Sequence, residues 1–291
     1  MATLLTLRRR IKSASNVAKA TRAMQMIAAS NLRKAQQATL ASRPYVAKLS
    51  DLARDLSRKV ENPHEHPYIT APGESMKTLV IVLSPDKGLC GGLVSNLLRE
   101  FLSFDKLHAE TEYIVIGKKL EGKVIKMKNE VLASFVFGTT LPKFDAVYPI
   151  AKLINDAYLS GKVSSVKVLY TDFNSMFSQT PKVVDLLPIA LHTEPVSEGK
   201  AVVEDNGTML YEPSIHAILP SLLSHYLEMS LYQFLLESYL SEQAARMVSM
   251  QNATNNAKDI IEGFKLEYNK TRQSNITSEL LDIMGTKKKE M

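Results

Sequence analysis

The longest hydrophobic pattern in this sequence runs from Ser214 to Met284 and has the spacing of a single helix. Between Leu219 and Tyr268, apolar residues recur every three or four positions, as in a helix that packs along one stripe. No proline follows Pro220, and the only glycines are Gly263 and Gly285. The sequence therefore predicts one long helix, with Pro220 in its first turn and Gly285 as its C-terminal stop.

A second helical pattern occupies the other end of the chain, from Leu4 to Val60. Most of its heptad a and d positions are apolar, and many are alanine, serine or threonine. Such small residues let two helices approach closely. Pro44 is the only proline in the pattern and could kink the helix. The two terminal helices should pair as an antiparallel coiled coil, with the last turns of the longer C-terminal helix extending beyond its partner.

Strand and helix signals alternate between the two terminal patterns. Strands are predicted at 77–83, 113–117, 131–137, 163–173 and 182–189, and helices at 93–104 and 146–159. The last two strands could form an antiparallel hairpin, and a polar loop is expected at 193–208. This alternation predicts a Rossmann-like α/β domain with a largely parallel sheet. The expected division is an N-terminal coiled-coil helix (1–62), a central α/β domain (63–213) and a C-terminal coiled-coil helix (214–291).

The charge is concentrated at the N-terminal end of the chain. Residues 1–60 contain thirteen Lys and Arg against two acids, a net of +11, so the whole-chain charge of +6 leaves −5 for the remainder. A basic surface of this kind favours an acidic partner, which could be nucleic acid, anionic lipid or an acidic protein surface. The basic, acid-free start also resembles a mitochondrial transit peptide, but the helical pattern continues well past the length of one.

Composition excludes several other classes of protein. The chain has 291 residues, of which 45% are hydrophobic, enough for one or two folded domains. Its single cysteine, Cys90, allows no internal disulfide. No apolar run approaches the roughly 20 residues of a membrane-spanning helix.

The search for catalytic chemistry gives weak candidates only. No phosphate-binding P-loop motif is present. The segment SPDKGLCGG (Ser84–Gly92) could hold an anion on backbone amides, although a tight turn is the favoured interpretation. His64 and His66 could form a metal pair, but a solvated loop is favoured. Cys90 is better explained as a buried small side chain than as a nucleophile. The sequence predicts no cofactor, no metal and no catalytic residue.

Three segments closely resemble the γ subunit of F-type ATP synthase. They are RRRIKSASNVAKATRAMQMIAASNLRKA (Arg8–Ala35), SPDKGLCGG, and SEQAARMVSMQNATNNAKDIIEGFKLEYNKTRQSNITSELLDI (Ser241–Ile283). The resemblance implies a rotor stalk without bond chemistry of its own. Its coiled coil would turn inside a ring of three α and three β subunits. The α/β domain would form a foot against the ε subunit and the membrane-embedded c-ring.

The resemblance also implies which residues contact partners. Met24 in TRAMQM and Arg246 in SEQAARM match positions in the region that couples to the β subunits. Arg272 and Gln273 in TRQSNIT match the pair that meets a β-subunit catch loop, and Thr277 and Glu279 in ITSEL match positions tied to the same coupling. Tyr211 and Glu212 in LYEPS resemble the foot segment near the c-ring. The polar segment Asn252–Asn256 is interpreted as an exposed surface of a stalk that must turn in a sleeve.

The intact N-terminal motif, without a cleavable leader, favours a peripheral location on the cytoplasmic face of a bacterial inner membrane, with a processed organellar chain as the alternative. The alternative function is a coiled-coil protein that binds nucleic acid through its basic N-terminal helix. Little aromatic interleaving accompanies the basic residues, since Tyr45 is the only aromatic residue before Tyr68. That disfavours stacking on single strands but leaves phosphate contacts open.

Overall fold

A computed structural model describes residues 3–59, 66–70, 77–108, 110–127, 130–189, 211–212 and 214–286 of the chain. The predicted polar loop at 193–208 and His64 lie outside these residues. Packing divides the chain into two units, one of Met1–Ala29 with Arg246–Met291 and the other of Ser30–Ala245. We call the first the helical unit and the second the sheet unit, and describe each separately.

Two long helices form the ends of the chain, α1 (Leu4–Lys59) and α5 (Ile215–Thr286). The Oγ of Ser214 accepts a hydrogen bond from Ala217 N at 3.3 Å, so Ser214 caps the start of α5. Two predicted details are wrong. Pro220 lies in the second turn of α5 and not in the first, and Gly285 is the penultimate residue of the helix and not its stop. The α1 helix continues through Pro44.

The sheet unit contains a five-stranded sheet in the order β3-β2-β1-β4-β5. The first four strands run parallel and β5 is antiparallel to β4, which confirms the predicted fold class and terminal hairpin. The strands are β1 (Thr78–Leu83), β2 (Thr111–Ile116), β3 (Glu130–Phe135), β4 (Ser165–Phe173) and β5 (Gln179–Leu187).

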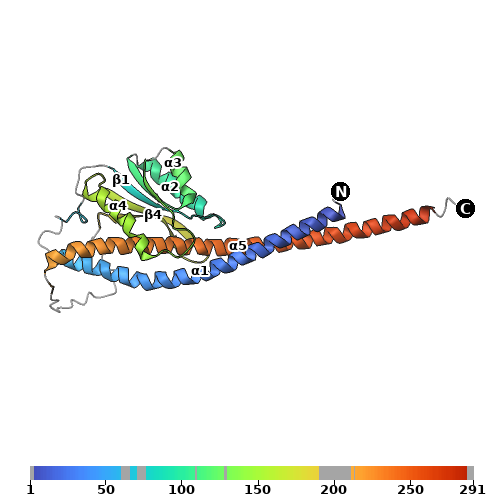
Figure 1. The fold of residues 1–291 in the computed structure, drawn as a ribbon, viewed down its shortest axis with the longest axis horizontal. Helices are drawn as coiled ribbons and strands as arrows, with labels where there is room; N and C mark the ends of the chain where they lie inside the picture. Colours follow the sequence, from blue (N-terminus) through green and yellow to red (C-terminus); the bar gives the residue numbers. More distant parts are fainter. Residues whose placement is uncertain are drawn as a thin grey trace, which may run out of the picture. The chain divides into compact units, whose positions relative to one another are not determined.

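Each face of the sheet is covered by helices, which is why β1 is apolar from Leu79 to Leu83. Leu79, Ile81 and Leu83 enter a core with α4 (Tyr148–Leu159) and the parts of α1 and α5 in this unit. Val80 and Val82 point the other way, into a core with α2 (Leu93–Leu107) and α3 (Lys118–Lys126). Figure 1 shows α2 and α3 on one face and α4 on the other. A strand buried on both faces requires a continuous apolar run.

The sequence prediction missed α3 and a 3-10 turn, η2 (Phe144–Ala146). The α3 segment KKLEGKVIK contains only three apolar residues, and Leu120 and Val124 are the two that are buried. Two buried residues one turn apart are too few to produce a recognisable helical period.

In each unit, α1 and α5 pair in an antiparallel manner. In the helical unit, Thr21 contacts Thr254 and Gln25 contacts Gln251. In the sheet unit, the Arg43 guanidinium lies 3.1 Å from the Glu237 carboxylate, and the Tyr45 hydroxyl lies 3.0 Å from His225 Nε2. Positions that advance along α1 meet positions that recede along α5, as the coiled-coil prediction requires.

Candidate functional site

The coupling residues implied by the resemblance lie on accessible faces of the helical unit. Met24 is 42% exposed, whereas Arg246 is half-buried. Gln273 and Thr277 lie one turn apart on α5, where the Thr277 Oγ1 donates a 2.9 Å hydrogen bond to the Gln273 carbonyl. The structure places these side chains at a surface but does not gather them into one cluster.

The C-terminal part of α5 is exposed around its whole circumference. Every residue from 272 to 281 is exposed, including Arg272, Gln273, Thr277 and Glu279. Ile276 is 48%, Leu280 56% and Leu281 64% exposed. Among the described residues, this segment therefore lacks a packing partner, as the predicted overhang requires.

The polar segment Asn252–Asn256 is only partly the exposed surface that the sequence suggested. Its three asparagines are exposed, but Thr254 is 1% exposed and its hydroxyl contacts Thr21 Oγ1 at 2.7 Å. The interpretation is therefore wrong for Thr254. The sequence signal was a threonine at a seam position, which pairs across to another seam threonine.

The two predicted foot residues occupy a short segment beside the end of α1. The Lys59 ammonium donates a 2.9 Å hydrogen bond to the Tyr211 hydroxyl and lies 5.1 Å from the centre of its ring. Glu212 is exposed. Tyr211 thus has a role in holding the C-terminal end of α1, and Glu212 is accessible to a partner.

The SPDKGLCGG segment forms tight turns at the carboxyl end of β1. Leu89 and Gly91 adopt positive φ values of 64° and 58°. Cys90 is 1% exposed and packs against Leu93 and Ala245, as predicted for a small buried side chain. The amides of Leu93 and Asn96 donate to carbonyls of this segment. The positive φ values and the burial of Cys90 agree with the tight-turn interpretation.

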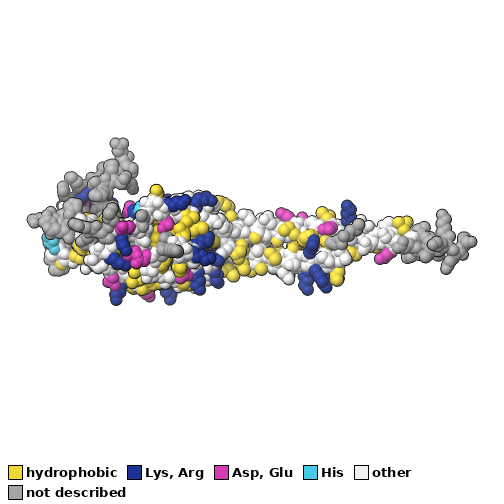
Figure 2. Space-filling view, turned by 90° about the horizontal axis from the view of Figure 1, so that it is seen from above, with side chains coloured by type: hydrophobic (Ala, Val, Ile, Leu, Met, Phe, Trp, Pro, Cys, Tyr) yellow, Lys and Arg dark blue, Asp and Glu magenta, His cyan; other side chains and the backbone are white. Residues whose placement is uncertain are grey.

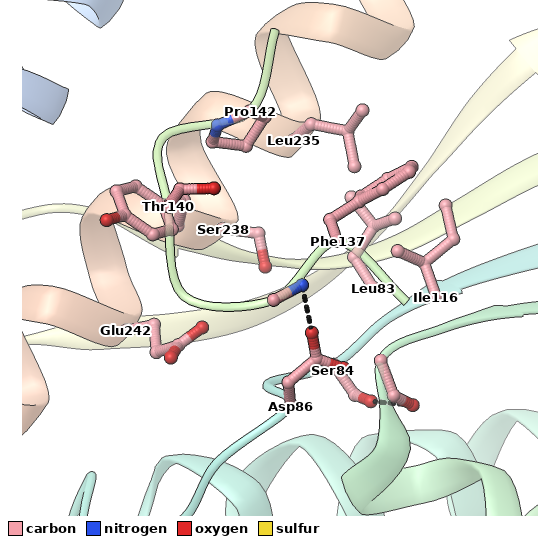
Figure 3. Close-up of a pocket in the computed structure, with 13 residues that line it drawn as sticks. Leu83, Ser84, Asp86, Ile116, Phe137, Thr140, Pro142, Leu235, Ser238 and Glu242 are labelled. Atoms are coloured by element: carbon pink, nitrogen blue, oxygen red, sulfur yellow. Dashed lines mark hydrogen bonds between the residues drawn. The ribbon is translucent and has the colours of Figure 1, made fainter. Parts of the chain in front are cut away.

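A small pocket lies at the carboxyl ends of the parallel strands, between the sheet and α5 (Figure 3). The Asp86 carboxylate accepts hydrogen bonds from Lys118 N at 3.0 Å and from Gly138 N at 2.6 Å. The Ser84 Oγ donates to the Gly117 carbonyl at 2.9 Å. Asp86 and Ser84 therefore bind neighbouring loops of their own chain, and the first turn of α3 has its amides occupied. Sequence reasoning missed this, because the partners lie 32 and 52 residues away.

Removing the Asp86 carboxylate should loosen two loops at once. We expect Asp86→Ala to destabilise the sheet unit by about 1 kcal/mol, because two amides lose a charged acceptor near the surface. Hydrogen exchange at the Lys118 and Gly138 amides should accelerate, while exchange within β5 stays unchanged. Asp86→Asn, which keeps one acceptor oxygen, is the matched control and should protect one of the two amides. Unchanged exchange at both amides in Asp86→Ala would contradict this role.

The described residues contain no group of three or more His, Cys, Asp or Glu arranged to hold a metal ion. His66 instead has a local structural contact, in which its Nδ1 accepts a 3.2 Å hydrogen bond from Tyr68 N. Burial lowers the pKa of the His66 imidazole, which suits this acceptor role.

Basic side chains are not confined to α1. Figure 2 looks onto the side that carries α2 and α3 in Figure 1, and Lys and Arg side chains gather there among hydrophobic ones. Lys118, Lys119, Lys123 and Lys126 are exposed along α3. Charge alone therefore does not single out α1 as the surface for an acidic partner. Over the described ranges, no helix is long and apolar enough to cross a membrane.

Comparisons with known proteins agree over nearly the whole chain. The family model described as "ATP synthase" matches residues 3–288. The ATP synthase gamma chain of Dehalococcoides mccartyi is 39% identical over 289 residues, covering 98% of both chains. That of Paraburkholderia phytofirmans is 37% identical over 291 residues, again covering 98% of both.

Two solved structures share the fold. The rotor of Euglena gracilis mitochondrial ATP synthase matches with a TM-score of 0.64 and 16% identity, over 94% of this chain and 98% of that one. The central stalk and c-ring structure of Tetrahymena thermophila ATP synthase matches with a TM-score of 0.56 and 24% identity, over 80% and 98%. None of these findings supports a nucleic-acid-binding function. The chain therefore belongs to the ATP synthase gamma-chain family, and its function is that of the central rotor stalk of the complex.

Proposed function

We propose that this chain has no catalytic site of its own and turns inside a ring of three α and three β subunits. Rotation of a membrane c-ring, driven by ion flow, would turn the stalk. An asymmetric stalk presents a different face to each β subunit, so its rotation would favour a different conformation of each in turn. ATP synthesis, or hydrolysis in reverse, would then take place on the β subunits.

The observation that carries this proposal is the exposed end of α5. Residues 272–281 of α5 are exposed on all sides, and Ile276, Leu280 and Leu281 are among them. This segment therefore exposes apolar area that a binding partner would bury. A sleeve formed by α and β subunits would cover this segment. The mixture of apolar side chains with Arg272 and Glu279 suits a contact that must break and reform during rotation.

In this proposal the named residues form two groups, one in the terminal helices and one in the foot domain. Met24, Arg246, Arg272, Gln273, Thr277 and Glu279 contact β subunits and transmit rotation to them. Tyr211 and Glu212 belong to a foot domain at 63–213, between helical segments at 1–62 and 214–291. The foot would meet the ε subunit and the c-ring. The bacterial relatives favour a location at the cytoplasmic face of the inner membrane.

Met24→Lys tests the coupling role directly. Met24 is 42% exposed, so lysine is tolerated by the fold but places a charge where an apolar contact is proposed. We expect coupling efficiency, measured as ATP synthesised per unit of ion gradient in reconstituted vesicles, to fall by about tenfold. Assembly of the complex should change little. Met26→Lys is the matched control, since Met26 is 66% exposed on another side of the helix, and should retain coupling.

Equal coupling in Met24→Lys and in the wild-type chain would overturn the assigned role of Met24. A separate experiment tests the stalk function as a whole. The purified chain, mixed with α and β subunits, should assemble into an active ATPase. It should also co-purify with ε and the c-ring from membranes. Failure to assemble, together with nucleic-acid binding that weakens steeply with salt, would favour the alternative function.

A further inference from the structure

Two polar contacts join α1 to α5 inside the seam of the helical unit. The Thr21 and Thr254 hydroxyls lie 2.7 Å apart. One layer along, the Gln25 side-chain amide donates to the Gln251 carbonyl oxygen. The Gln251 amide in turn donates to Asn255 Oδ1 at 3.2 Å. Hydroxyls and amides thus form a hydrogen-bonded set that crosses between the helices at two consecutive layers, and we call it the interhelical lock.

The hydroxyl pair is directional. Thr254 Oγ1 contacts the Met250 carbonyl at 2.7 Å, and Thr21 Oγ1 contacts the Ala18 carbonyl at the longer distance of 3.2 Å. Two hydroxyl protons cannot serve three contacts. The two short contacts are satisfied when Thr21 donates to Thr254 and Thr254 donates to the Met250 carbonyl. In this arrangement the hydroxyl of Thr21 on α1 is hydrogen-bonded to Thr254 on α5, whose own hydroxyl is hydrogen-bonded to the α5 backbone.

Apolar packing in this part of the seam is thin. The flanking α1 seam positions are the small residues Ala14, Ala18 and Ala28. Hydrophobic attraction is non-directional, and small side chains provide little area to resist rolling of one helix on the other. Hydrogen bonds weaken steeply when their angles change. In this seam the polar contacts are therefore the stronger constraint on the rotation of each helix about its own axis.

The lock lies beside residues assigned to coupling. Gln25 follows Met24 directly in α1, and Gln251 lies five residues after Arg246 in α5. Because a helix is rigid over one turn, holding the Gln25 side chain against α5 also sets the direction in which Met24 points. This orienting role would account for the mostly polar segment Gln251–Asn256, which is unexpected in a packed helix.

We propose that Thr21, Gln25, Gln251 and Thr254 are positioning residues, which hold α1 on α5 at one azimuth and so aim Met24 at its partner. The inference rests on the proposed coupling function, but the lock itself is testable without it. This positioning role also explains why the two helices carry glutamines and not leucines at positions 25 and 251. A leucine pair in place of the glutamines should pack at least as stably, because removing both partners of a hydrogen bond leaves none unsatisfied.

The structural arm of the test uses spin labels on the full chain. Cys90→Ala removes the only native thiol, and Arg22→Cys with Lys258→Cys places labels on exposed positions of the two helices. The distance distribution should be narrow in this background and clearly broader once Gln25→Leu and Gln251→Leu are added. Labels at Lys258→Cys and Lys265→Cys, both on α5, are the control and should give one distribution in both backgrounds.

The functional arm uses the assembled complex in vesicles. Gln25→Leu with Gln251→Leu should leave the melting temperature unchanged or raised, yet lower coupling efficiency about two- to tenfold. Gln25→Glu with Gln251→Lys restores a directional pair and should restore both the narrow distribution and coupling. If the leucine variant folds poorly, Thr21→Val with Thr254→Val tests the other layer with the same labels.

The outcomes separate the lock from the coupling role. An unchanged distance distribution in the leucine variant, as judged against the α5 control pair, overturns the lock. A broader distribution with full coupling overturns its positioning role, while the lock as a structural feature stands. Normal coupling in Met24→Lys would instead remove the coupling assignment of Met24 on which the positioning role depends.

Discussion

Gly117→Ala should unfold the sheet unit or destabilise it by at least about 3 kcal/mol, because two separate constraints exclude a side chain there. Gly117 has a φ of +96°, a region that L-residues with a Cβ rarely adopt. A Cβ would also lie 1.9 Å from the Ser84 carbonyl oxygen. Neither strand end can withdraw easily. Ser84 N donates to the Ile116 carbonyl at 2.7 Å, and Gly117 N donates to the Phe135 carbonyl at 2.8 Å.

The measurement is amide hydrogen exchange across β1. Far-ultraviolet circular dichroism is less suitable, because the two long helices would dominate its signal. Protection of Leu79 to Leu83 should collapse in Gly117→Ala. Gly122→Ala is the matched control, because Gly122 lies in α3 and a Cβ there would meet nothing within 4 Å. That change should stabilise the unit by about 0.5–1 kcal/mol. Wild-type protection in Gly117→Ala would show that the loops after β1 and β2 can separate without unfolding.

The sequence predicted what depends on repeated spacing along the chain. Both long helices follow from heptads that extend over many turns, and β1 follows from an unbroken apolar run that only a strand covered on both faces requires. In each case one physical cause acts at many positions, so a few irregular residues do not hide it. The family resemblance then supplied the function from three specific segments.

What the sequence did not predict depends on single contacts between distant residues. Asp86 is a polar residue in a turn until the partners of its carboxylate are known. Thr254 belonged to a polar segment that suggested an exposed face, and only its pairing with Thr21 reveals an inner role. Proline is most favourable in the first turn of a helix, which is the basis of the prediction for Pro220. A helix that is capped by Ser214 and packed through Leu219 and Leu223 nevertheless tolerates proline in its second turn.

Helix α3 shows the same limit for a short element. Only the position of Leu120 and Val124 against Val80, Val82 and Val115 of the sheet identifies it as a covering helix. No local periodicity carries that information. The coupling residues are a third case, because an exposed side chain has no packing signal and its assignment comes from the resemblance alone.

The second large effect concerns Glu112, a carboxylate that is 1% exposed at the start of β2. Lys162 Nζ lies 2.7 Å from one of its oxygens and Lys77 Nζ 3.2 Å from the other. We expect Lys77→Met with Lys162→Met to destabilise the sheet unit by about 3–5 kcal/mol, because a buried charge is left without a partner. Adding Glu112→Met should recover most of the loss, since an apolar group then fills the same space.

The contribution of Glu112 to stability should change with pH in opposite directions in the wild-type chain and in the double variant. Burial alone would raise the pKa of the Glu112 carboxyl, but hydrogen bonds from Lys162 and Lys77 outweigh it and lower the pKa below its usual value. In the wild-type chain this group's contribution is therefore present above the unfolded-state pKa and lost as pH falls through the lower folded-state value.

Without the two lysines, burial should raise the pKa of Glu112, so that acidification stabilises the double variant until the carboxyl is protonated. Urea denaturation of the sheet unit, followed by hydrogen exchange between about pH 4 and pH 7, measures both slopes. The triple variant, which has no carboxyl at this position, should lose the inverted dependence. If double and wild-type chains lost stability in parallel on acidification, the two lysines would not be what keeps Glu112 ionised, because their removal should reverse the sign.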